Sequence, residues 1–376
     1  MRKVCYISGT RADFGLMEAA LKAIDADPDL ALTILVTGMH LDPAYGSTIE
    51  EIRATGLVVT GEAPVRLSPA TGATMARGIG TMLGGFVDHL ERERPDLVLL
   101  LGDRGEMLAG ALAAIHLNIP VAHIHGGERS GTVDEPIRHA ISKLSHLHLT
   151  TTAGAHDRLI RMGERADRVF VCGAPGLDGL AETPRINREQ ICAQYGFDPL
   201  LPLALMAMHP VLQDAARAGQ DARLLTERLL AGGLQVVAVM PNSDAGSDAI
   251  REVIAEVRGR ANLAVETHLA RDRFVACMAA ADVFAGNSSS GIIEAATFGT
   301  PVINVGSRQR LRERNANVTD VDCTPAAIDS ALSTALAGGR LPAENIYGDG
   351  RAAGRIVSIL RDTPLDAELM RKINVY

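Results

Sequence analysis

Apolar residues along this chain occur in two alternating patterns. Short runs of consecutive apolar residues predict buried β-strands. We expect these strands at residues 3–8, 31–37, 96–101, 119–124, 168–172, 203–208, 235–240, 281–285 and 301–305. Between them, apolar residues recur at helical spacing, which predicts helices at residues 14–26, 46–55, 72–93, 104–117, 219–231, 245–257, 271–280 and 290–298. Continuous apolar strands separated by helices are typical of parallel sheets covered on both faces, so the sequence predicts an α/β fold.

A stretch rich in glycine and proline, residues 173–202, separates the two halves of this pattern. We interpret it as a linker between two Rossmann-like domains, residues 1–175 and 176–354, that face each other across a cleft. In sheets of this kind ligands bind at the carboxyl ends of the strands, where loops lead into helices. The loops that directly follow the predicted strands are therefore the places to look for chemistry.

Composition narrows the class of protein. The 376 residues are 47% hydrophobic and 22% charged, which is ordinary for a globular protein. A net charge of −8 and the absence of Trp argue against a nucleic-acid-binding protein. No apolar run approaches the ~20 residues that span a bilayer, and the N-terminus lacks the features of a signal peptide. The five cysteines are scattered and never form a CxxC pair, which disfavours a disulfide framework or zinc site and indicates a cytoplasmic protein.

The first candidate loop is SGTRADFG, which follows the first predicted strand. Gly9 permits a tight turn, the N-terminus of the following helix attracts anions, and the guanidinium of Arg11 suits a phosphate. The alternative is an ordinary capped turn with Arg11 in solvent. Because the GxGxxG pattern is absent and no acidic residue ends the next strand, a nicotinamide cofactor is not supported.

The second candidate loop begins GNSSSGIIE at Gly286. Ser288, Ser289 and Ser290 offer more hydroxyl and backbone N–H groups at a helix start than an N-cap requires. Gly291 allows a ligand to approach closely. Glu294, about one helical turn further on, is suited to accept hydrogen bonds from both hydroxyls of a ribose, although a lone Glu at such a place is more commonly solvated.

Acidic and histidine residues gather after two strands of the first half. The motif LLGDRGE places Asp103 and Arg104 directly after a strand. The motif HIHGGERSGTVDEPIRH contributes His123, His125, Glu128, Asp134, Glu135 and His139. Their spacing matches no standard metal site, so we interpret the group as acid–base residues and expect no metal, while helix capping accounts for some of the acids. His40 and His209 also end strands and are further candidates.

Two loops of the second half carry groups suited to phosphate. PNSDAGSD contains Asn242, which either caps a helix or binds phosphate. VGSRQRLRERNANV contains Arg308, Arg310, Arg312 and Arg314. We assign Arg308 to an anionic ligand and interpret the other three arginines as a solvated helix start.

Together these motifs resemble the UDP-N-acetylglucosamine 2-epimerase family, specifically its hydrolysing branch in bacterial sialic-acid and legionaminic-acid biosynthesis. The resemblance is carried by SGTRADFGLM, TGMHLDPAYG, LLGDRGE, HIHGGE, GTVDEPIRHAISKLSHLH, PNSDAGSD, GNSSSGIIEAATFGTPVINVGSRQ and YGDG. These stretches occur in the family's order over nearly the whole chain. The resemblance implies a GT-B fold with the nucleotide held mainly by the second domain, and we expect a C-terminal helix, residues 355–376, to pack back on the first domain.

The resemblance also implies roles for individual residues. Nucleotide-sugar binding is expected at Arg11, His40, Arg104, Asn242, Ser288, Ser289, Ser290, Gly291, Glu294 and Arg308. Catalytic roles are expected for Asp103, Glu128, Asp134, His209 and His125. Some members carry a glutamate where this chain has His125, so the role of that acid falls on Glu128, on His125 or elsewhere. Which of Asp134 and Glu135 faces the sugar stays open.

The implied reaction converts UDP-N-acetylglucosamine into N-acetylmannosamine and UDP. A base removes the C2 proton while UDP leaves C1, which gives 2-acetamidoglucal, and water then adds at C1 as C2 is reprotonated on the opposite face. No cofactor is expected, the partner is the nucleotide sugar, and a homodimer is the expected assembly. The alternatives are the same reaction on a UDP- or GDP-linked 2,4-diacetamido-2,4,6-trideoxyhexose, a non-hydrolysing epimerase, a GT-B glycosyltransferase and a sensor without turnover.

Overall fold

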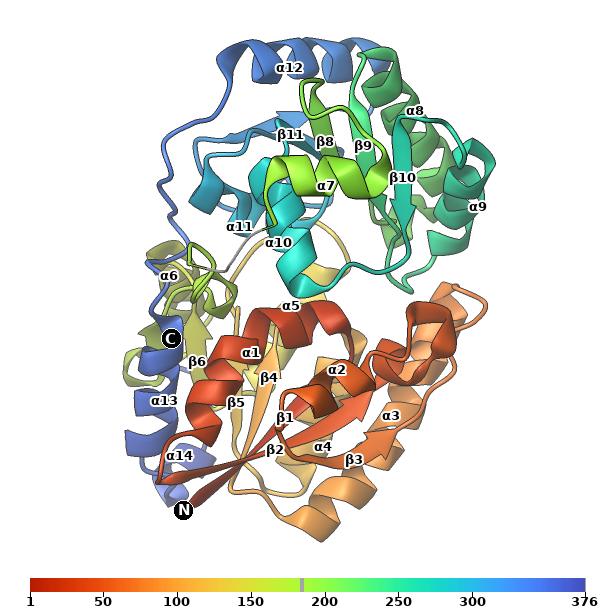
Figure 1. Cartoon of the computed structure of the whole chain (residues 1–376). Helices are drawn as coiled ribbons and strands as arrows, with labels where there is room; N and C mark the ends of the chain where they lie inside the picture. Colours follow the sequence, from red (N-terminus) through yellow and green to blue (C-terminus); the bar gives the residue numbers. More distant parts are fainter. Residues whose placement is uncertain (183–185, 376) are drawn as a thin grey trace.

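Two parallel sheets, one in each domain, organise the chain (Figure 1). The structure is a computed structural model, and it describes residues 1–182 and 186–375. Residues 183–185 of the expected linker and residue 376 of the expected C-terminal helix lie outside the described residues.

The first sheet has seven strands in the order β3-β2-β1-β4-β5-β6-β7, all parallel. The strands are β1 (Arg2–Ser8), β2 (Leu30–Thr37), β3 (Val59–Ala63), β4 (Leu97–Leu101), β5 (Val121–Ile124), β6 (Leu147–Thr150) and β7 (Val169–Val171). The helices between them are α1 (Arg11–Asp25), α2 (Ile49–Ala54), α3 (Gly72–Glu93), α4 (Gly105–His116), α5 (Asp134–Leu144) and α6 (Ala153–Arg161). Residues 4–7 of β1 and 97–100 of β4 are fully buried, as expected for strands covered on both faces.

The second sheet has six strands in the order β10-β9-β8-β11-β12-β13, again all parallel. The strands are β8 (Leu203–Ala207), β9 (Gln235–Val239), β10 (Leu263–Glu266), β11 (Val283–Gly286), β12 (Val302–Val305) and β13 (Val318–Val321). The helices of this domain are α7 (Arg188–Tyr195), α8 (Ala218–Ala231), α9 (Ser247–Val257), α10 (Arg271–Ala280), α11 (Ser289–Ile293) and α12 (Pro325–Gly338).

The direction in which strands are added reverses once in each sheet. In the first sheet the chain adds β2 and β3 on one side of β1 and then returns to add β4 on the other side of β1. In the second sheet it adds β9 and β10 on one side of β8 and then returns to add β11 on the other side of β8. At such a point the neighbouring loops lead to helices on opposite faces of the sheet and leave a crevice at the carboxyl ends of the strands. Three of the candidate loops, those after β1, β4 and β11, lie at these two crevices, as does the candidate His209 after β8.

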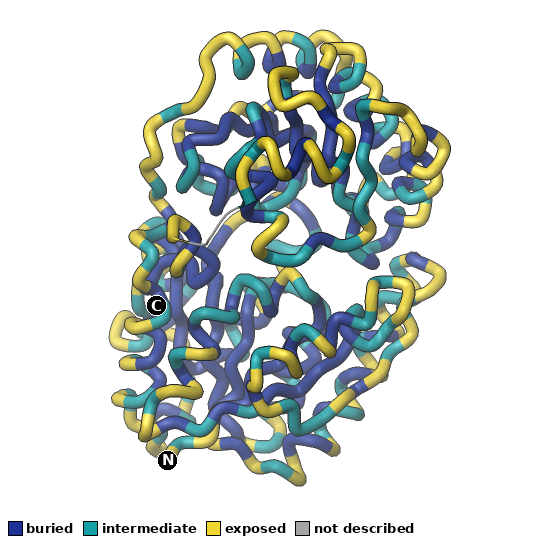
Figure 2. The backbone as a smooth tube through the Cα atoms, viewed as in Figure 1, coloured by how far each residue is buried: buried dark blue, intermediate teal, exposed yellow. Residues whose placement is uncertain are grey.

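Helices cover both faces of each sheet, and the residues of the sheet centres are buried (Figure 2). Apolar side chains between the layers form buried clusters in both domains. On one face of the first sheet, Met17 and Leu21 of α1 share a buried cluster with Ile356 and Leu360 of α13 (Ala352–Asp362). The end of the chain therefore contributes to the core of the N-terminal domain.

The C-terminal segment is not one continuous helix. Helix α13 ends at Asp362, and the extended Thr363 and Pro364, which lacks a backbone N–H, separate it from the short α14 (Ala367–Met370). The expectation of a single helix over residues 355–376 is corrected accordingly.

Candidate active site

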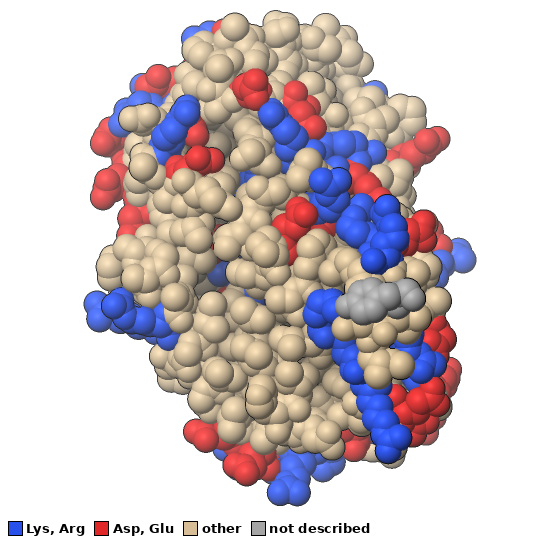
Figure 3. All heavy atoms as spheres, turned by 180° about the vertical axis from the view of Figure 1, so that it is seen from behind, with Lys and Arg blue, Asp and Glu red and all other residues tan. Residues whose placement is uncertain are grey.

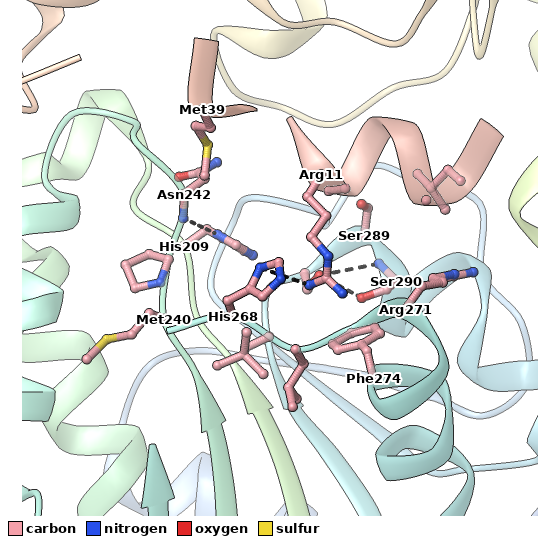
Figure 4. Close-up of a pocket in the computed structure, with 18 of the residues that line it drawn as sticks. Arg11, Met39, His209, Met240, Asn242, His268, Arg271, Phe274, Ser289 and Ser290 are labelled. Carbon is pink, nitrogen blue, oxygen red and sulfur yellow. Dashed lines mark hydrogen bonds between the residues drawn. The ribbon is translucent and has the colours of Figure 1, made fainter. Parts of the chain in front are cut away.

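Two adjacent cavities lie where loops of the two domains meet. The larger one, here called the serine cavity, is lined by Arg11 of the first domain and by His209, Asn242 and the serine loop of the second (Figure 4). The smaller one, here called the acid cavity, is lined by Asp103, Arg104, Asp134, Ser243 and Asp244 together with apolar side chains of the first domain. The cavities adjoin because consecutive residues line them: Met39 and Asn242 line the serine cavity, while Gly38 and Ser243 line the acid cavity.

A buried carboxylate fixes the loop that carries Arg11. The Asp13 side chain accepts hydrogen bonds from backbone N–H groups that include that of Gly9 (3.0 Å), as part of a capping box at the start of α1. Arg11 extends into the serine cavity, where its Nη1 lies 3.2 Å from Nδ1 of His268 and its Nε donates to Glu51 (2.9 Å). Because His268 follows β10 of the second domain, this contact joins the domains across the cavity (Figure 4).

Gly286 and Asn287 shape the serine loop. Gly286 has a φ of +139°, and a Cβ atom there would lie 2.0 Å from the carbonyl oxygen of Ala207, so no other residue fits. The Asn287 side chain accepts a hydrogen bond from the backbone N–H of His209 (2.7 Å) and donates to its carbonyl oxygen (2.8 Å). The serine loop and the loop after β8 are thereby held together.

Ser288, Ser289 and Ser290 all line the serine cavity. Ser288 is the N-cap of α11, and its Oγ lies 2.7 Å from Oγ of Ser290. Gly291, which was expected to admit a ligand, is instead buried, and a Cβ atom there would lie 3.1 Å from Cγ1 of Val302. Its missing side chain serves the packing of α11 on β12.

A carboxylate, a guanidinium and an aromatic ring lie together in the wall of the serine cavity. Glu294 is 1% exposed, and its Oε1 accepts a hydrogen bond from Nη2 of Arg271, which also donates to the carbonyl oxygen of Gly176 (3.1 Å). Phe274, three residues after Arg271 on α10, lines the same cavity (Figure 4). A carboxylate that accepts hydrogen bonds beside a flat apolar ring is a suitable arrangement for a nucleoside, whose vicinal hydroxyls donate and whose base stacks.

His209 enters the cavity as a neutral imidazole. Burial, together with the nearby cations Arg308 and Arg104, lowers the pKa of His209 to about 3. The backbone N–H of Asn242 donates to Nδ1 of His209 (3.5 Å), which leaves Nε2 as the protonated ring nitrogen. Arg308 itself does not line either cavity; its Nη1 donates to the carbonyl oxygen of Asn287 (3.1 Å).

Asp103 and Asp134 both line the acid cavity, and each lies beside an arginine. Asp103 accepts a hydrogen bond from the fully buried Arg138, and Asp134 lies 3.7 Å from Nη2 of Arg308. Arg104, beside them, pairs with Asp244 of the second domain (3.3 Å), so a further ion pair crosses the cleft.

The neighbour of Asp134 has a different task. Glu135 Oε2 accepts hydrogen bonds from the backbone N–H groups of Ser130 (2.7 Å) and Gly131 (2.8 Å), and Glu135 lines neither cavity. Asp134 therefore lines the acid cavity, whereas Glu135 closes the loop before α5.

Glu128 lies behind the acid cavity and does not line it. Its side chain is 2% exposed, and its Oε1 accepts a hydrogen bond from Thr151 (2.8 Å) and lies 3.1 Å from Nδ1 of His125. Its Oε2 pairs with Arg312 of the second domain, whose side chain is 7% exposed and lies 4.0 Å from Asp103. The interpretation of Arg312 as a solvated residue is therefore wrong, since this side chain is buried between the domains.

His125 and His40 also stand outside the two cavities. His125 has a φ of +65° and is buried, and burial lowers its pKa to about 3, so it meets Glu128 as a neutral ring. His40 is buried between the hydroxyls of Ser8 (2.9 Å) and Thr48 (2.8 Å). Both histidines therefore contact buried polar side chains of the protein and line neither cavity.

Several residues of this region had no assigned role in the sequence analysis, among them Arg138, His268, Arg271 and Phe274. His268 follows β10, a strand that the apolar pattern did not predict, and Arg271 and Phe274 lie in the helix predicted at residues 271–280, to which no site residue was assigned. Arg138 stands inside the quoted motif GTVDEPIRH but one turn into α5, where an arginine is most often solvated.

Within the part of the chain that the structure describes, no group of three or more His, Cys, Asp or Glu side chains is arranged to hold a metal ion. None of the helices in residues 1–182 and 186–375 is both long and apolar enough to cross a bilayer. On the face of the molecule opposite to the view of Figure 1, acidic and basic side chains are intermingled (Figure 3).

Comparison with known proteins identifies the family. The sequence matches the UDP-N-acetylglucosamine 2-epimerase family over residues 22–361. It is 49% identical over 376 residues, all of both chains, to the UDP-N,N'-diacetylbacillosamine 2-epimerase (hydrolyzing) of Legionella pneumophila. It is 34% identical over 354 residues, 93% of this chain and 92% of the other, to the UDP-N-acetylglucosamine 2-epimerase of Neisseria meningitidis serogroup B.

The solved structures agree with the fold. The UDP-N-acetylglucosamine 2-epimerase from Neisseria meningitidis bound to UDP-GlcNAc matches with a TM-score of 0.80 at 19% identity, over 96% of this chain and 100% of the other. This likeness and the two parallel sheets confirm the predicted GT-B arrangement. The chain therefore belongs to the UDP-N-acetylglucosamine 2-epimerase family and is a nucleotide-sugar 2-epimerase.

Proposed function

We propose that this chain hydrolyses UDP-N,N'-diacetylbacillosamine with inversion at C2. The products are UDP and free 2,4-diacetamido-2,4,6-trideoxymannose, so one water molecule is consumed for each sugar released. The observation that carries the proposal is the 49% identity, without a length difference, to the Legionella pneumophila enzyme that bears this activity in its name. The relative named for UDP-N-acetylglucosamine is more distant, at 34%.

In this proposal the serine cavity takes the UDP group. Glu294 accepts hydrogen bonds from the ribose hydroxyls, and Phe274 stacks on the uracil. The serine hydroxyls, Arg11 and the Nε2–H of His209 stabilise the negative charge that grows on the diphosphate as its bond to C1 breaks. His209 suits this task because its lowered pKa keeps it a neutral donor over the whole physiological range.

The acid cavity takes the sugar. Four carboxylates line it, and Arg104 pairs with two of them, Glu106 (3.1 Å) and Asp244 (3.3 Å). The other two, Asp103 and Asp134, are assigned the two proton transfers at C2, one on each face of the ring. Removal of the C2 proton together with departure of UDP from C1 gives a glycal, and water adds at C1 while C2 is reprotonated on the other face. Glu128, which lines neither of these two cavities, holds Arg312 beside Asp103 and is a positioning residue in this scheme.

The test is proton NMR of the enzyme in D₂O with the UDP-linked diacetamido sugar, without added metal, nicotinamide or sugar acceptor. We expect free sugar deuterated at C2 to appear together with an equal amount of UDP. Return of a UDP-linked epimer would instead identify a non-hydrolysing epimerase, and release of UDP only after an acceptor is added would identify a glycosyltransferase. Either result, or an inert spectrum, would overturn the proposal.

The second candidate is the corresponding reaction of UDP-N-acetylglucosamine to N-acetylmannosamine. It is favoured by the relative from Neisseria meningitidis, which matches 93% of this chain. The same spectra recorded with UDP-N-acetylglucosamine, and with the GDP-linked diacetamido sugar, compare the candidates directly through kcat/KM.

A further inference from the structure

The lining of the acid cavity has an ionic part and an apolar part. The ionic groups come from the loop after β4 and the first turn of α4, from the loop after β9 and from the start of α5. The apolar part, here called the apolar wall, is formed by the segment after β3, by α3 and by the start of α5. Its side chains are Val65, Leu67, Met75, Ile79, Met82, Val133 and Ile137.

Two glycines allow this apolar wall to stand close to the reacting groups. A Cβ atom on Gly105, which directly follows Asp103 and Arg104, would lie 2.8 Å from Cγ1 of Ile79. A Cβ atom on Gly78 would lie 3.2 Å from Cγ2 of Val65. Ile79 therefore rests directly on the loop that carries Asp103, and Val65 packs against the same helix.

Two polar side chains, Thr74 and Arg66, also belong to this part of the lining. Thr74 is hydrogen-bonded to Thr71 (3.0 Å), and Arg66 is exposed and donates through Nε to the carbonyl oxygen of Ser68 (2.7 Å). A sugar hydroxyl placed against the apolar wall would lose its water without gaining a partner, whereas a methyl group there would be buried at no such cost.

The position of the wall relative to the diphosphate fixes which part of the sugar it meets. The serine and acid cavities adjoin at Met39 and Asn242, so a sugar linked to a diphosphate in the first cavity extends into the second. Its C1 and C2 atoms must lie beside Asp103 and Asp134 for proton transfer. Because apolar side chains make up much of the remaining lining, the remote atoms of the ring, C4 to C6, meet the apolar wall.

We infer that the apolar wall formed around Val65 and Ile79 selects sugars that carry methyl groups at their remote end, namely a C6 methyl and the acetyl methyl of a C4 acetamido group. This inference rests on the proposed function and deepens it, because it names the side chains that distinguish a 2,4-diacetamido-2,4,6-trideoxyhexose from N-acetylglucosamine. The latter has hydroxyls at both positions. A hydrophobic pocket rejects an added hydroxyl by at most about 100-fold, so the expected preference lies between roughly 10-fold and 100-fold in kcat/KM.

The experiment measures kcat/KM for UDP-N,N'-diacetylbacillosamine and for UDP-N-acetylglucosamine with wild type and three variants. Val65→Thr replaces a methyl by a hydroxyl of the same shape, and the double variant Val65→Thr/Ile79→Thr extends the change. The control is Val87→Thr, also on α3, which packs into the core and lines neither cavity. The inhibition constant for UDP reports on the serine cavity in every variant.

We expect the double variant to lose about tenfold in kcat/KM for the diacetamido donor and to keep or gain activity with UDP-N-acetylglucosamine, so that the preference falls by at least about tenfold. The inhibition constant for UDP should not change, and Val87→Thr should keep the wild-type preference. If the wild type hydrolyses the diacetamido donor but the double variant keeps the preference, or loses both activities equally, the inference fails and the proposed function stands. A wild type that does not hydrolyse the diacetamido donor overturns both.

Discussion

Removal of the positive charge of Arg312 should destabilise the protein far more than its position in an arginine-rich loop suggests. Arg312 is the cation that pairs with the buried carboxylate of Glu128, because the neighbouring His125 is neutral at pH 7. The substitution Arg312→Met keeps an unbranched apolar stem and deletes only the guanidinium. Glu128 is then left with the Thr151 hydroxyl and a neutral imidazole.

The magnitude follows from burial. The side chains of Glu128 and Arg312 are 2% and 7% exposed, and deletion of one member of such a buried pair costs about 3–5 kcal/mol. For a domain of roughly 150–250 residues, 1 kcal/mol shifts the Tm by about 2–4 °C, so the expected loss is on the order of 10 °C. The matched control is Arg310→Met, two residues away, whose side chain is 45% exposed and pairs with Asp322; deletion of this pair should cost at most about 1 kcal/mol.

Thermal unfolding followed by circular dichroism, at one pH and ionic strength, compares the two variants with wild type. The double variant Glu128→Gln/Arg312→Met should recover part of the lost Tm, because the amide removes the unpaired charge. Equal Tm values for the two single variants, or a double variant no better than Arg312→Met, would refute the assignment of Arg312 to a buried ion pair between the domains.

Three further predictions concern the cavities and the titration of the protein. Glu294→Ala should weaken UDP binding by about 1–3 kcal/mol because the ribose hydroxyls lose their acceptor, and unchanged affinity in calorimetry would remove Glu294 from that role. Asp103→Asn should bind UDP as wild type does and lose at least about 100-fold in C2 proton exchange, whereas full exchange in D₂O would end its assignment as a proton-transfer group. Burial lowers the pKa of His146 to about 4, so the unfolded chain takes up a proton at this residue before the folded protein does. The free energy of unfolding therefore falls as pH drops below about 6.5, by up to about 1.4 kcal/mol per pH unit. His146→Gln should flatten the dependence of the urea midpoint on pH, and an unchanged slope would contradict the lowered pKa.

The centre of each sheet was predictable and three of the four edges were not. Strands such as β4 and β8 are continuous apolar runs because helices cover both of their faces, and that pattern is visible in the sequence. β3 (VTGEA), β10 (LAVE) and β13 (VTDV) are edge strands with polar positions at the surface, so their apolar pattern is too weak to predict them.

The fourth unpredicted strand, β6, lies inside the first sheet and was obscured by a buried polar pair. Its sequence LHLT contains His148, which is fully buried and whose Nε2 lies 2.9 Å from Glu164. Because Glu164 is not adjacent in sequence, His148 interrupts the apolar pattern of β6, and the pattern does not predict a buried strand there.

The candidate site divides in a similar way. Residues on loops that directly follow predicted strands, such as Ser288 and Asp103, line the cavities, as the sequence led us to expect. Arg312 was wrongly interpreted as solvated because its partner Glu128 belongs to the other domain and lies 184 positions earlier in the chain. Such a pair forms only when the two domains pack against each other, and the local sequence pattern around Arg312 does not predict this contact.

The packing of α13 on α1 has a consequence for the order of events during synthesis. The seven strands of the first sheet have all left the ribosome once Val171 has emerged. The apolar side of α1, however, is covered only after residues 352–362 of α13 have been synthesised, and these are among the last to be made. The N-terminal domain therefore cannot complete its core before the second domain has been synthesised, although N-terminal domains generally fold first. A nascent chain halted anywhere before residue 352 lacks this helix and presents an uncovered hydrophobic surface to chaperones and proteases.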